Sequence, residues 1–176
     1  MNPKYLGDSY DLVKRFFCRE LSLLGYSVAV DPMFTGAWSA NEQEFYRLIG
    51  AEPIAGERTT STRAALFLDP DTGINEKGGG KHASFDRLAQ EAASYELVFA
   101  FDQSFSRQCK PEKVMREKLS ALRSRGCHGM FYDSHARFVF VATERHALHE
   151  LQLQLLSLGL PASRLLTADA EWGSRS

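Results

Sequence analysis

Four short apolar runs in this chain each end at an aspartate, and this pattern constrains the fold more than any other feature. Runs of about five residues rich in Val, Phe and Leu are typical of buried strands, and helical patterns lie between them. A chain that alternates in this way forms a largely parallel sheet covered by helices. The runs and their aspartates are Tyr26–Val30 with Asp31, Ala64–Leu68 with Asp69, Leu97–Phe101 with Asp102, and Gly129–Tyr132 with Asp133.

The order of these elements predicts a three-layer, Rossmann-like α/β domain over residues 1–168, followed by a frayed tail at 169–176. The sheet is expected to be mainly parallel, with an antiparallel C-terminal hairpin at one edge. The last two strands, ending at Asp133 and beginning at Arg137, lie too close in sequence for a parallel crossover. Capping residues and apolar periodicity predict helices over 9–24, 42–49, 85–92, 111–125 and 146–158.

Length and composition favour one globular domain. The chain has 176 residues, of which 44% are hydrophobic and 24% charged, and its net charge of −1 gives no general attraction to a polyanion. The N-terminus lacks an apolar signal core, and no run is long enough to span a bilayer, so we expect a cytoplasmic protein without a membrane partner. Three cysteines, Cys18, Cys109 and Cys127, lack metal or redox spacing and are predicted to be reduced and structural.

The aspartates that follow the strands predict a metal site. Ligands of an open parallel sheet bind outside the carboxyl ends of its strands. Carboxylates that converge there repel one another unless a cation neutralises them, and hard oxygen ligands suit Mg²⁺ or Mn²⁺. The expected ligands are Asp31, Asp69, Asp71 and Asp102. The alternative is that each aspartate only caps a helix or makes a turn.

A glycine-rich segment after the second run carries Lys81 and His82. On a mobile loop that reaches back over Asp69 and Asp71, the lysine would offset charge in a pentavalent transition state and the histidine would transfer a proton. These residue types are what a metal-dependent phosphodiesterase, a nuclease-like hydrolase, needs. The alternative is a basic surface loop whose glycines only make turns.

Two further segments predict contacts with a nucleic acid or nucleotide. Ser104 and Arg107 follow the third run and could hold a phosphate. The next helix is rich in lysine and arginine, and Lys113, Arg116 and Arg123 are the residues expected to bind phosphates. The alternatives are a helix-capping loop and a solvated helix face.

Other catalytic patterns are weakly supported. Ser134-His135 lacks a nucleophile elbow, His146 and His149 lack a third zinc ligand nearby, and the glycines at 78–80 lack the Lys-Ser/Thr of a P-loop. Pro70-Asp71 begins a Pro-Asp…Asp/Glu-x-Lys nuclease pattern, but no lysine follows Asp102 at the required spacing.

A second interpretation comes from a family resemblance. The segment Val30–Gly36 is similar to the first motif of Rossmann-like methyltransferases that act on nucleic-acid adenines, and Leu68–Thr72 resembles their Asp-Pro-Pro-Tyr motif with the last two positions changed. The strand and helix order over 64–143 resembles the C-terminal half of that fold. The resemblance covers about half of the chain and implies S-adenosylmethionine as cofactor. The span from Gly50 to Ala64 is shorter than the family requires, and the aromatic residue of the motif is absent.

Three functions therefore stay open: a metal-dependent phosphodiesterase as the first prediction, a reduced methyltransferase-like enzyme on nucleic acid, and a non-catalytic binding or assembly module. The sequence leaves open the oligomeric state, the biological pathway, and the choice among DNA, RNA and a free nucleotide.

Overall fold

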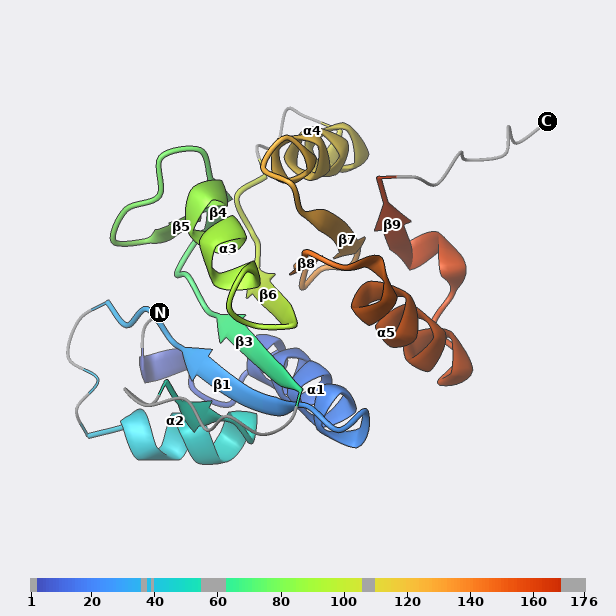
Figure 1. Ribbon diagram of the computed structural model, residues 1–176. Coiled ribbons are helices and arrows are strands. Elements are labelled where there is room, and N and C mark those ends of the chain that lie inside the picture. The colour runs from blue at the N-terminus through green and yellow to red at the C-terminus, as the bar shows by residue number, and fades with distance from the viewer. Residues whose placement is uncertain (1–2, 36–37, 39, 55–62, 106–109, 169–176) are drawn as a thin grey trace.

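A computed structural model describes residues 3–35, 38, 40–54, 63–105 and 110–168 (Figure 1). In these residues the chain forms an α/β structure with one mixed sheet of seven strands, in the order β2-β1-β3-β6-β8-β7-β9. The strands are β1 (Ser27–Asp31), β2 (Glu52–Pro53), β3 (Ala64–Leu68), β6 (Leu97–Phe101), β7 (His128–Tyr132), β8 (Phe138–Ala142) and β9 (Leu165–Thr167).

The sheet has a parallel part and an antiparallel part. Strands β2, β1, β3 and β6 run parallel to one another, whereas β8 is antiparallel to both β6 and β7. The predicted hairpin is therefore present as β7 and β8, with its second strand next to β6. Strand β9, which the sequence did not predict, pairs antiparallel with β7 and forms the edge beyond the hairpin.

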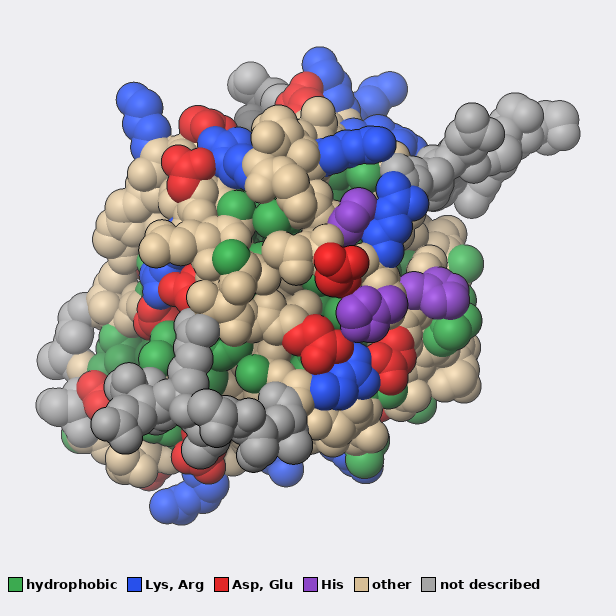
Figure 2. All heavy atoms as spheres, in the orientation of Figure 1, with side chains coloured by type: hydrophobic (Ala, Val, Ile, Leu, Met, Phe, Trp, Pro, Cys, Tyr) green, Lys and Arg blue, Asp and Glu red, His purple; other side chains and the backbone are tan. Residues whose placement is uncertain are grey.

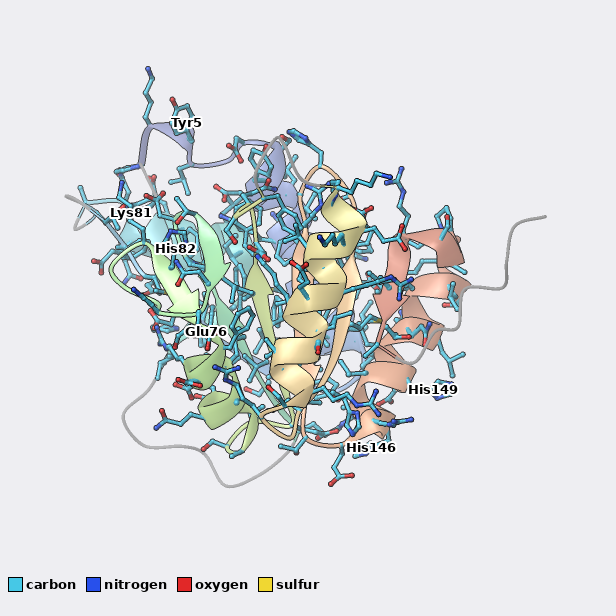
Figure 3. The ribbon with its side chains drawn as sticks, turned by 90° about the horizontal axis from the view of Figure 1, so that it is seen from above. Tyr5, Glu76, Lys81, His82, His146 and His149 are labelled. Carbon is cyan, nitrogen blue, oxygen red and sulfur yellow. The ribbon has the colours of Figure 1, made fainter. Side chains whose placement is uncertain are left out.

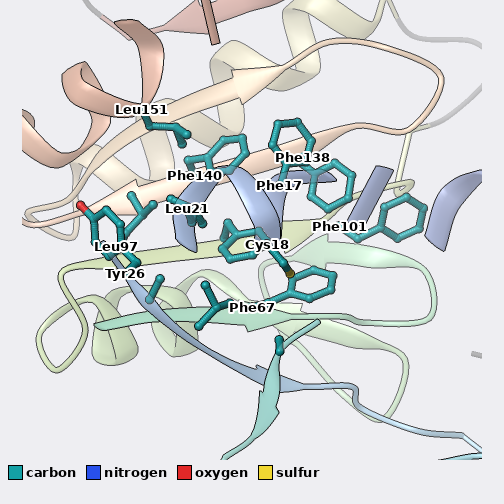
Figure 4. Close-up of a cluster of buried hydrophobic side chains, with 14 of the residues drawn as sticks. Phe17, Cys18, Leu21, Tyr26, Phe67, Leu97, Phe101, Phe138, Phe140 and Leu151 are labelled. Carbon is teal, nitrogen blue, oxygen red and sulfur yellow. The ribbon is translucent and has the colours of Figure 1, made fainter. Parts of the chain in front are cut away.

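Helices cover both faces of the sheet, because alternate residues of each buried strand point to opposite faces. On one face a core cluster includes Phe17, Phe67 and Phe140 (Figure 4), and on the other Leu88, Leu119 and Val139 belong to a second cluster. The first cluster draws on α1 (Ser9–Leu23), α2 (Glu42–Ile49) and α5 (Arg145–Ser157), and the second on α3 (Phe85–Ala92) and α4 (Pro111–Arg123).

Local signals fix the helix ends at or near the predicted positions. Asp8 accepts hydrogen bonds from the first backbone N–H groups of α1, and Ser84 accepts one from Arg87 in α3. Gly50 ends α2 in a left-handed conformation, and Pro111 opens α4. These caps satisfy backbone groups that a helix leaves unpaired at its ends, so sequence alone located them.

Helix α1 differs from the prediction in the face that it buries. Leu12, expected on the apolar face, is 56% exposed, whereas Asp11 and Lys14 are buried with Cys18. Burial of the Cys18 thiol, reinforced by the nearby Asp69 carboxylate, raises its pKa to about 12. Cys18 and Cys127 are free and buried, as predicted, and Cys109 lies outside the described residues.

The glycine-rich segment contains more structure than the predicted loop. Strands β4 (Gly73–Asn75) and β5 (His82–Ser84) pair as a small parallel sheet, and Ile74 is buried. Gly73 has a φ of +114°, and a Cβ there would lie 2.2 Å from Asp102 Oδ1. Only glycine fits this approach of β4 to the end of β6.

No helix among the described residues has the length and apolar character needed to cross a membrane.

Candidate functional site

The aspartates at the strand ends lie at one edge of the sheet but point to different faces. The pairing register places Asp31 opposite Leu68, so Asp69 is one residue beyond it, and its N–H donates to the Asp31 carbonyl. The register between β3 and β6 places Asp102 one residue beyond again, because Leu68 pairs with Ala100. Each offset of one residue turns the next side chain to the opposite face.

Each of these side chains forms an ion pair with a lysine or arginine from a helix that covers the sheet. Asp69 contacts Lys14 of α1 on one face, and Asp102 contacts Lys118 of α4 on the other. Asp31 pairs with Arg87 of α3. No group of three His, Cys, Asp or Glu side chains that could hold a metal ion occurs within the described ranges. The structure therefore does not assemble the predicted ligands, Asp31, Asp69, Asp71 and Asp102, into one metal site, because lysine and arginine already neutralise three of them.

The Asp69 cluster consists of two buried carboxylates that share one ammonium group. Lys14 Nζ lies 2.8 Å from Asp69 Oδ2 and 2.9 Å from Asp11 Oδ1, and all three side chains are less than 5% exposed. Burial raises the pKa of Asp69 to about 6 despite the attraction of Lys14. Burial also opposes the charge on Lys14, but attraction by Asp69 and Asp11 outweighs it and raises the pKa of Lys14.

The Asp102 carboxylate is bonded by neighbouring groups of the protein itself. Lys118 Nζ lies 2.5 Å from Asp102 Oδ2 and also donates to the Ile74 carbonyl. Ser104 Oγ lies 2.6 Å from Asp102 Oδ1, and the Ile74 N–H donates to the same oxygen. Burial lowers the pKa of Lys118, although Asp102 opposes this shift. This cluster ties β4 to the end of β6, so Ser104, predicted to bind substrate, has a structural role.

A cavity of about 450 Å³ lies over the Asp69 cluster, at the carboxyl ends of β3 and β6. We call it the carboxyl-edge cavity. Lys14 and Asp11 form its floor together with Phe101, the last residue of β6. The described residues that line it are Tyr5, Asp8, Tyr10, Asp11, Lys14, Asp71, Phe101 and Gln103.

Contacts with the β7–β8 turn position the aromatic wall of this cavity. The Tyr10 ring stacks on His135 at 5.4 Å between centroids, and its hydroxyl lies 2.7 Å from His135 Nε2. The same ring meets Phe101 edge to face at 5.5 Å. Gln103 donates to the His135 carbonyl at 2.6 Å, and Lys14 Nζ lies 5.2 Å from the Phe101 centroid. Residues from three distant parts of the chain therefore hold Tyr10 and Phe101 in place.

The carboxyl-edge cavity carries an excess of negative charge. The described lining residues include three aspartates, Asp8, Asp11 and Asp71, and one lysine, Lys14, while Lys81 beside the cavity pairs with Asp71. Asp69, directly beneath, already shares the Lys14 ammonium. The combination of acidic groups and aromatic rings attracts cations, and a phosphate would be repelled.

The predicted catalytic pair lies beside this cavity. Lys81 Nζ is 3.8 Å from Asp71 Oδ2, and the His82 ring is within hydrogen-bonding distance of Thr72 Oγ1, at 2.9 Å from Nε2. Tyr5, Lys81 and His82 gather on one side of the molecule (Figure 3). The segment does reach back to the residues after β3, as expected, but the Lys81 side chain is 65% exposed and pairs with one carboxylate.

The basic helix is partly neutralised on its surface. Lys113 pairs with Glu117, and Arg116 with Glu112, each one helical turn away. Such exposed pairs leave little net charge for a phosphate. Arg123, at the end of α4, lies at the opposite edge of the sheet from the carboxyl-edge cavity, and Arg107 lies outside the described residues.

Sequence reasoning missed the residues that build this cavity. Asp11 lies seven residues before Cys18 and Lys14 seven residues before Leu21, on the stripe that α1 buries. Two charges of opposite sign on one stripe indicate a buried ion pair. Tyr10 carries no comparable signal, because its contact with His135 spans 125 residues.

No protein-family model matches the chain, and neither a curated protein nor a solved structure is similar enough to count as a match.

Proposed function

We propose that this protein is a methyltransferase-like enzyme that acts on nucleic acid and binds S-adenosylmethionine in the carboxyl-edge cavity. The observation that carries the proposal is the chemistry of the cavity lining, which combines an excess of carboxylates with aromatic rings. S-adenosylmethionine carries a sulfonium and an ammonium group, so it is a ligand of matching charge. A cavity of about 450 Å³ is also within the range typical of small-ligand sites.

The position of the cavity supports the proposal independently of its charge. Asp71, which lines the cavity, belongs to the Leu68–Thr72 segment that resembles the methyltransferase motif. The order of elements from β3 to β8, with helices between the parallel strands and then a hairpin, agrees with the same resemblance. In this proposal the helices on the two sheet faces are the outer layers of a three-layer, Rossmann-like domain.

Each residue of the cavity has a distinct part in the proposed binding. Lys14 holds the Asp11 and Asp69 side chains in place, so the buried part of the cavity is fixed in position and carries two carboxyl groups for one ammonium. The Tyr10 and Phe101 rings line the cavity, where they lie beside a bound cationic centre. Asp71, on the rim, accepts hydrogen bonds from a ligand ammonium or ribose hydroxyl. When bound, S-adenosylmethionine supplies an electrophilic methyl group, which the nucleic acid receives.

Thermal unfolding with two matched ligands tests the proposal. S-adenosylmethionine should raise the midpoint by several degrees at a concentration about 100-fold above its dissociation constant. S-adenosylhomocysteine has a neutral sulfur and should bind more weakly, because the cavity selects for charge. Absence of stabilisation by S-adenosylmethionine, or equal stabilisation by ATP, would contradict the proposal.

A metal-dependent phosphodiesterase is the second candidate, and one observation favours it. Asp71 is partly exposed next to Lys81, and Thr72 contacts His82, so one carboxylate and both predicted catalytic residues lie together. Mg²⁺ or Mn²⁺ should then stabilise the fold and support cleavage of an oligonucleotide that Asp71→Asn abolishes. Stabilisation by neither the metals nor S-adenosylmethionine would favour a non-catalytic module.

A further inference from the structure

A second cavity lies at the opposite edge of the sheet, where the parallel strands begin. It has a volume of about 140 Å³ and lies among the end of α4, the start of β7, the first turns of α5 and the end of β9. We call it the amino-edge cavity. The described residues that line it are Arg123, Cys127, His128, Gly129, Arg145, Leu148, His149, Gln152, Thr167 and Ala168.

Apart from the Cys127 thiol, the ionisable side chains among the described lining residues are basic, and Arg123 and Arg145 each also take part in another interaction. Arg123 comes from α4, Arg145 and His149 from adjacent turns of α5, and His128 from β7. No aspartate or glutamate is among the described residues that line the cavity. In the space-filling view, histidine side chains gather with basic and acidic side chains over α5 and β7 (Figure 2). Four basic groups from three elements thus meet at one small hollow.

Neutral donors complete the lining. Gln152 supplies a side-chain amide and Thr167 a hydroxyl, and both are only partly exposed. The backbone of Gly129 approaches α4 closely, since a Cβ there would lie 2.6 Å from Leu119 Cδ2. Gly129 therefore holds the start of β7 close to α4 and keeps His128 and Arg123 near each other.

The first turn of α5 adds to the positive potential. Backbone N–H groups at a helix start carry partial positive charge, which acidic residues normally offset. The first turn of α5 contains no acidic residue, and the capping residue Glu144 makes no side-chain capping bond. Arg145 and His149 instead add basic groups at this end, an arrangement that an anion would stabilise.

We propose that the amino-edge cavity binds a single phosphate group, from either inorganic phosphate or the terminal phosphate of a nucleotide. The volume of about 140 Å³ corresponds to roughly four or five water molecules. A tetrahedral oxyanion fits this space, whereas a nucleoside must remain outside it. Arginine binds phosphate oxygens through paired N–H groups, and two arginines with two histidines supply donors from several directions.

This proposal is independent of the proposed function. The two cavities share none of their described lining residues and lie at opposite edges of the sheet. His146 and His149 lie across the molecule from Tyr5 and Lys81 (Figure 3). A ligand of one cavity therefore cannot replace a ligand of the other, and each test can fail alone.

Titration calorimetry with inorganic phosphate, on the full chain at constant ionic strength, tests the proposal. Arg145→Gln should weaken binding about tenfold or more, because it removes charge-assisted hydrogen bonds. His149→Gln should weaken it by a smaller factor. His146→Gln is the matched control: this residue lies on the same helix but outside the cavity, 3.5 Å from Glu96, and its replacement should leave the affinity unchanged.

Further ligands distinguish the two sources of phosphate. A nucleoside 5′-monophosphate that binds more tightly than inorganic phosphate, with the same sensitivity to Arg145→Gln, would assign the site to a nucleotide. Equal affinities for the nucleotide and for inorganic phosphate would assign the site to the free ion. Absence of phosphate binding, or equal losses in His146→Gln and His149→Gln, would overturn the proposal. Since the replaced side chains are exposed, all variants should keep the parental thermal midpoint.

Discussion

The carboxyl-edge and amino-edge cavities differ in where their charges are placed. At the carboxyl edge the central charges are buried, with Asp11 and Lys14 each no more than 3% exposed. At the amino edge Arg123, Arg145 and His149 are exposed. The fold depends on the partner of a buried charge, whereas an exposed charge is also solvated by water. Replacing a charged residue of the cavity should therefore lower stability at the carboxyl edge and change it little at the amino edge.

The two cavities also differ in how they are assembled. Tyr10, Phe101 and His135 converge on the carboxyl-edge cavity from distant parts of the chain and contact one another. At the amino edge, Arg145 and His149 are neighbours on one helix. The first arrangement depends on tertiary packing, and the second follows largely from the spacing on α5. The following predictions test this contrast.

The largest expected effect is on stability. Lys14→Met leaves Asp69 and Asp11 buried without a counter-charge and should lower the free energy of unfolding by about 3 to 5 kcal/mol. The matched change Arg145→Met should cost less than about 1 kcal/mol, because this side chain is exposed. Urea unfolding measures both. Adding Asp69→Asn to Lys14→Met should restore part of the loss, and equal losses in the two single variants would contradict the contrast.

The second prediction concerns pH. The pKa of Asp69 is about 6 in the folded state, above its ordinary value of 3.8, so the folded state binds a proton that the unfolded state has released. The stability from this group is therefore complete below about pH 4 and is lost as the pH rises through 6. Asp69→Asn should remove a decrease of about 2 to 3 kcal/mol between pH 4 and 7. Urea unfolding at several pH values measures this, and an unchanged pH profile would count against a buried, ionised Asp69.

The third prediction is a crossed pair of binding effects. Asp71→Asn should weaken the binding of S-adenosylmethionine by about three- to tenfold, because it removes one partly exposed charge. It should leave phosphate binding unchanged. Arg145→Gln should weaken the binding of phosphate and leave the binding of S-adenosylmethionine unchanged. Calorimetry on both variants with both ligands measures the four affinities. A variant that changes the affinities for both ligands equally would show that the cavities are coupled.

The smallest effect is expected on the exposed face of α4. Lys113 and Arg116 are neutralised by Glu117 and Glu112, so replacing both by glutamine should change the slope of log affinity for an oligonucleotide against log salt by less than about one unit. Binding at several salt concentrations checks this. A decrease of two units in this slope would indicate that Lys113 and Arg116 bind phosphates, as the sequence predicted.

Sequence predicted the helices and the long strands well because their signals are local. Asp8, Ser84 and Pro111 mark helix starts by chemistry that acts within one turn. The short strands β2 and β9 were missed, since two or three residues carry no periodicity. The burial of Lys14 was missed because a lysine is normally exposed, and one of its two buried partners, Asp69, lies 55 residues away.

The sequence by itself determined that three strands end in aspartates at one edge of the sheet, because apolar content and chain order specify strands and their direction. Only the tertiary structure decided what those aspartates do. The pairing register offsets Asp69 from Asp31, and Asp102 from Asp69, by one residue each. Since side chains alternate between faces, each offset directs the next carboxylate to another helix and another cation. Register depends on packing across the whole sheet. The aspartates that were predicted to share a metal therefore form separate ion pairs, and the carboxyl-edge cavity lies above one of these pairs.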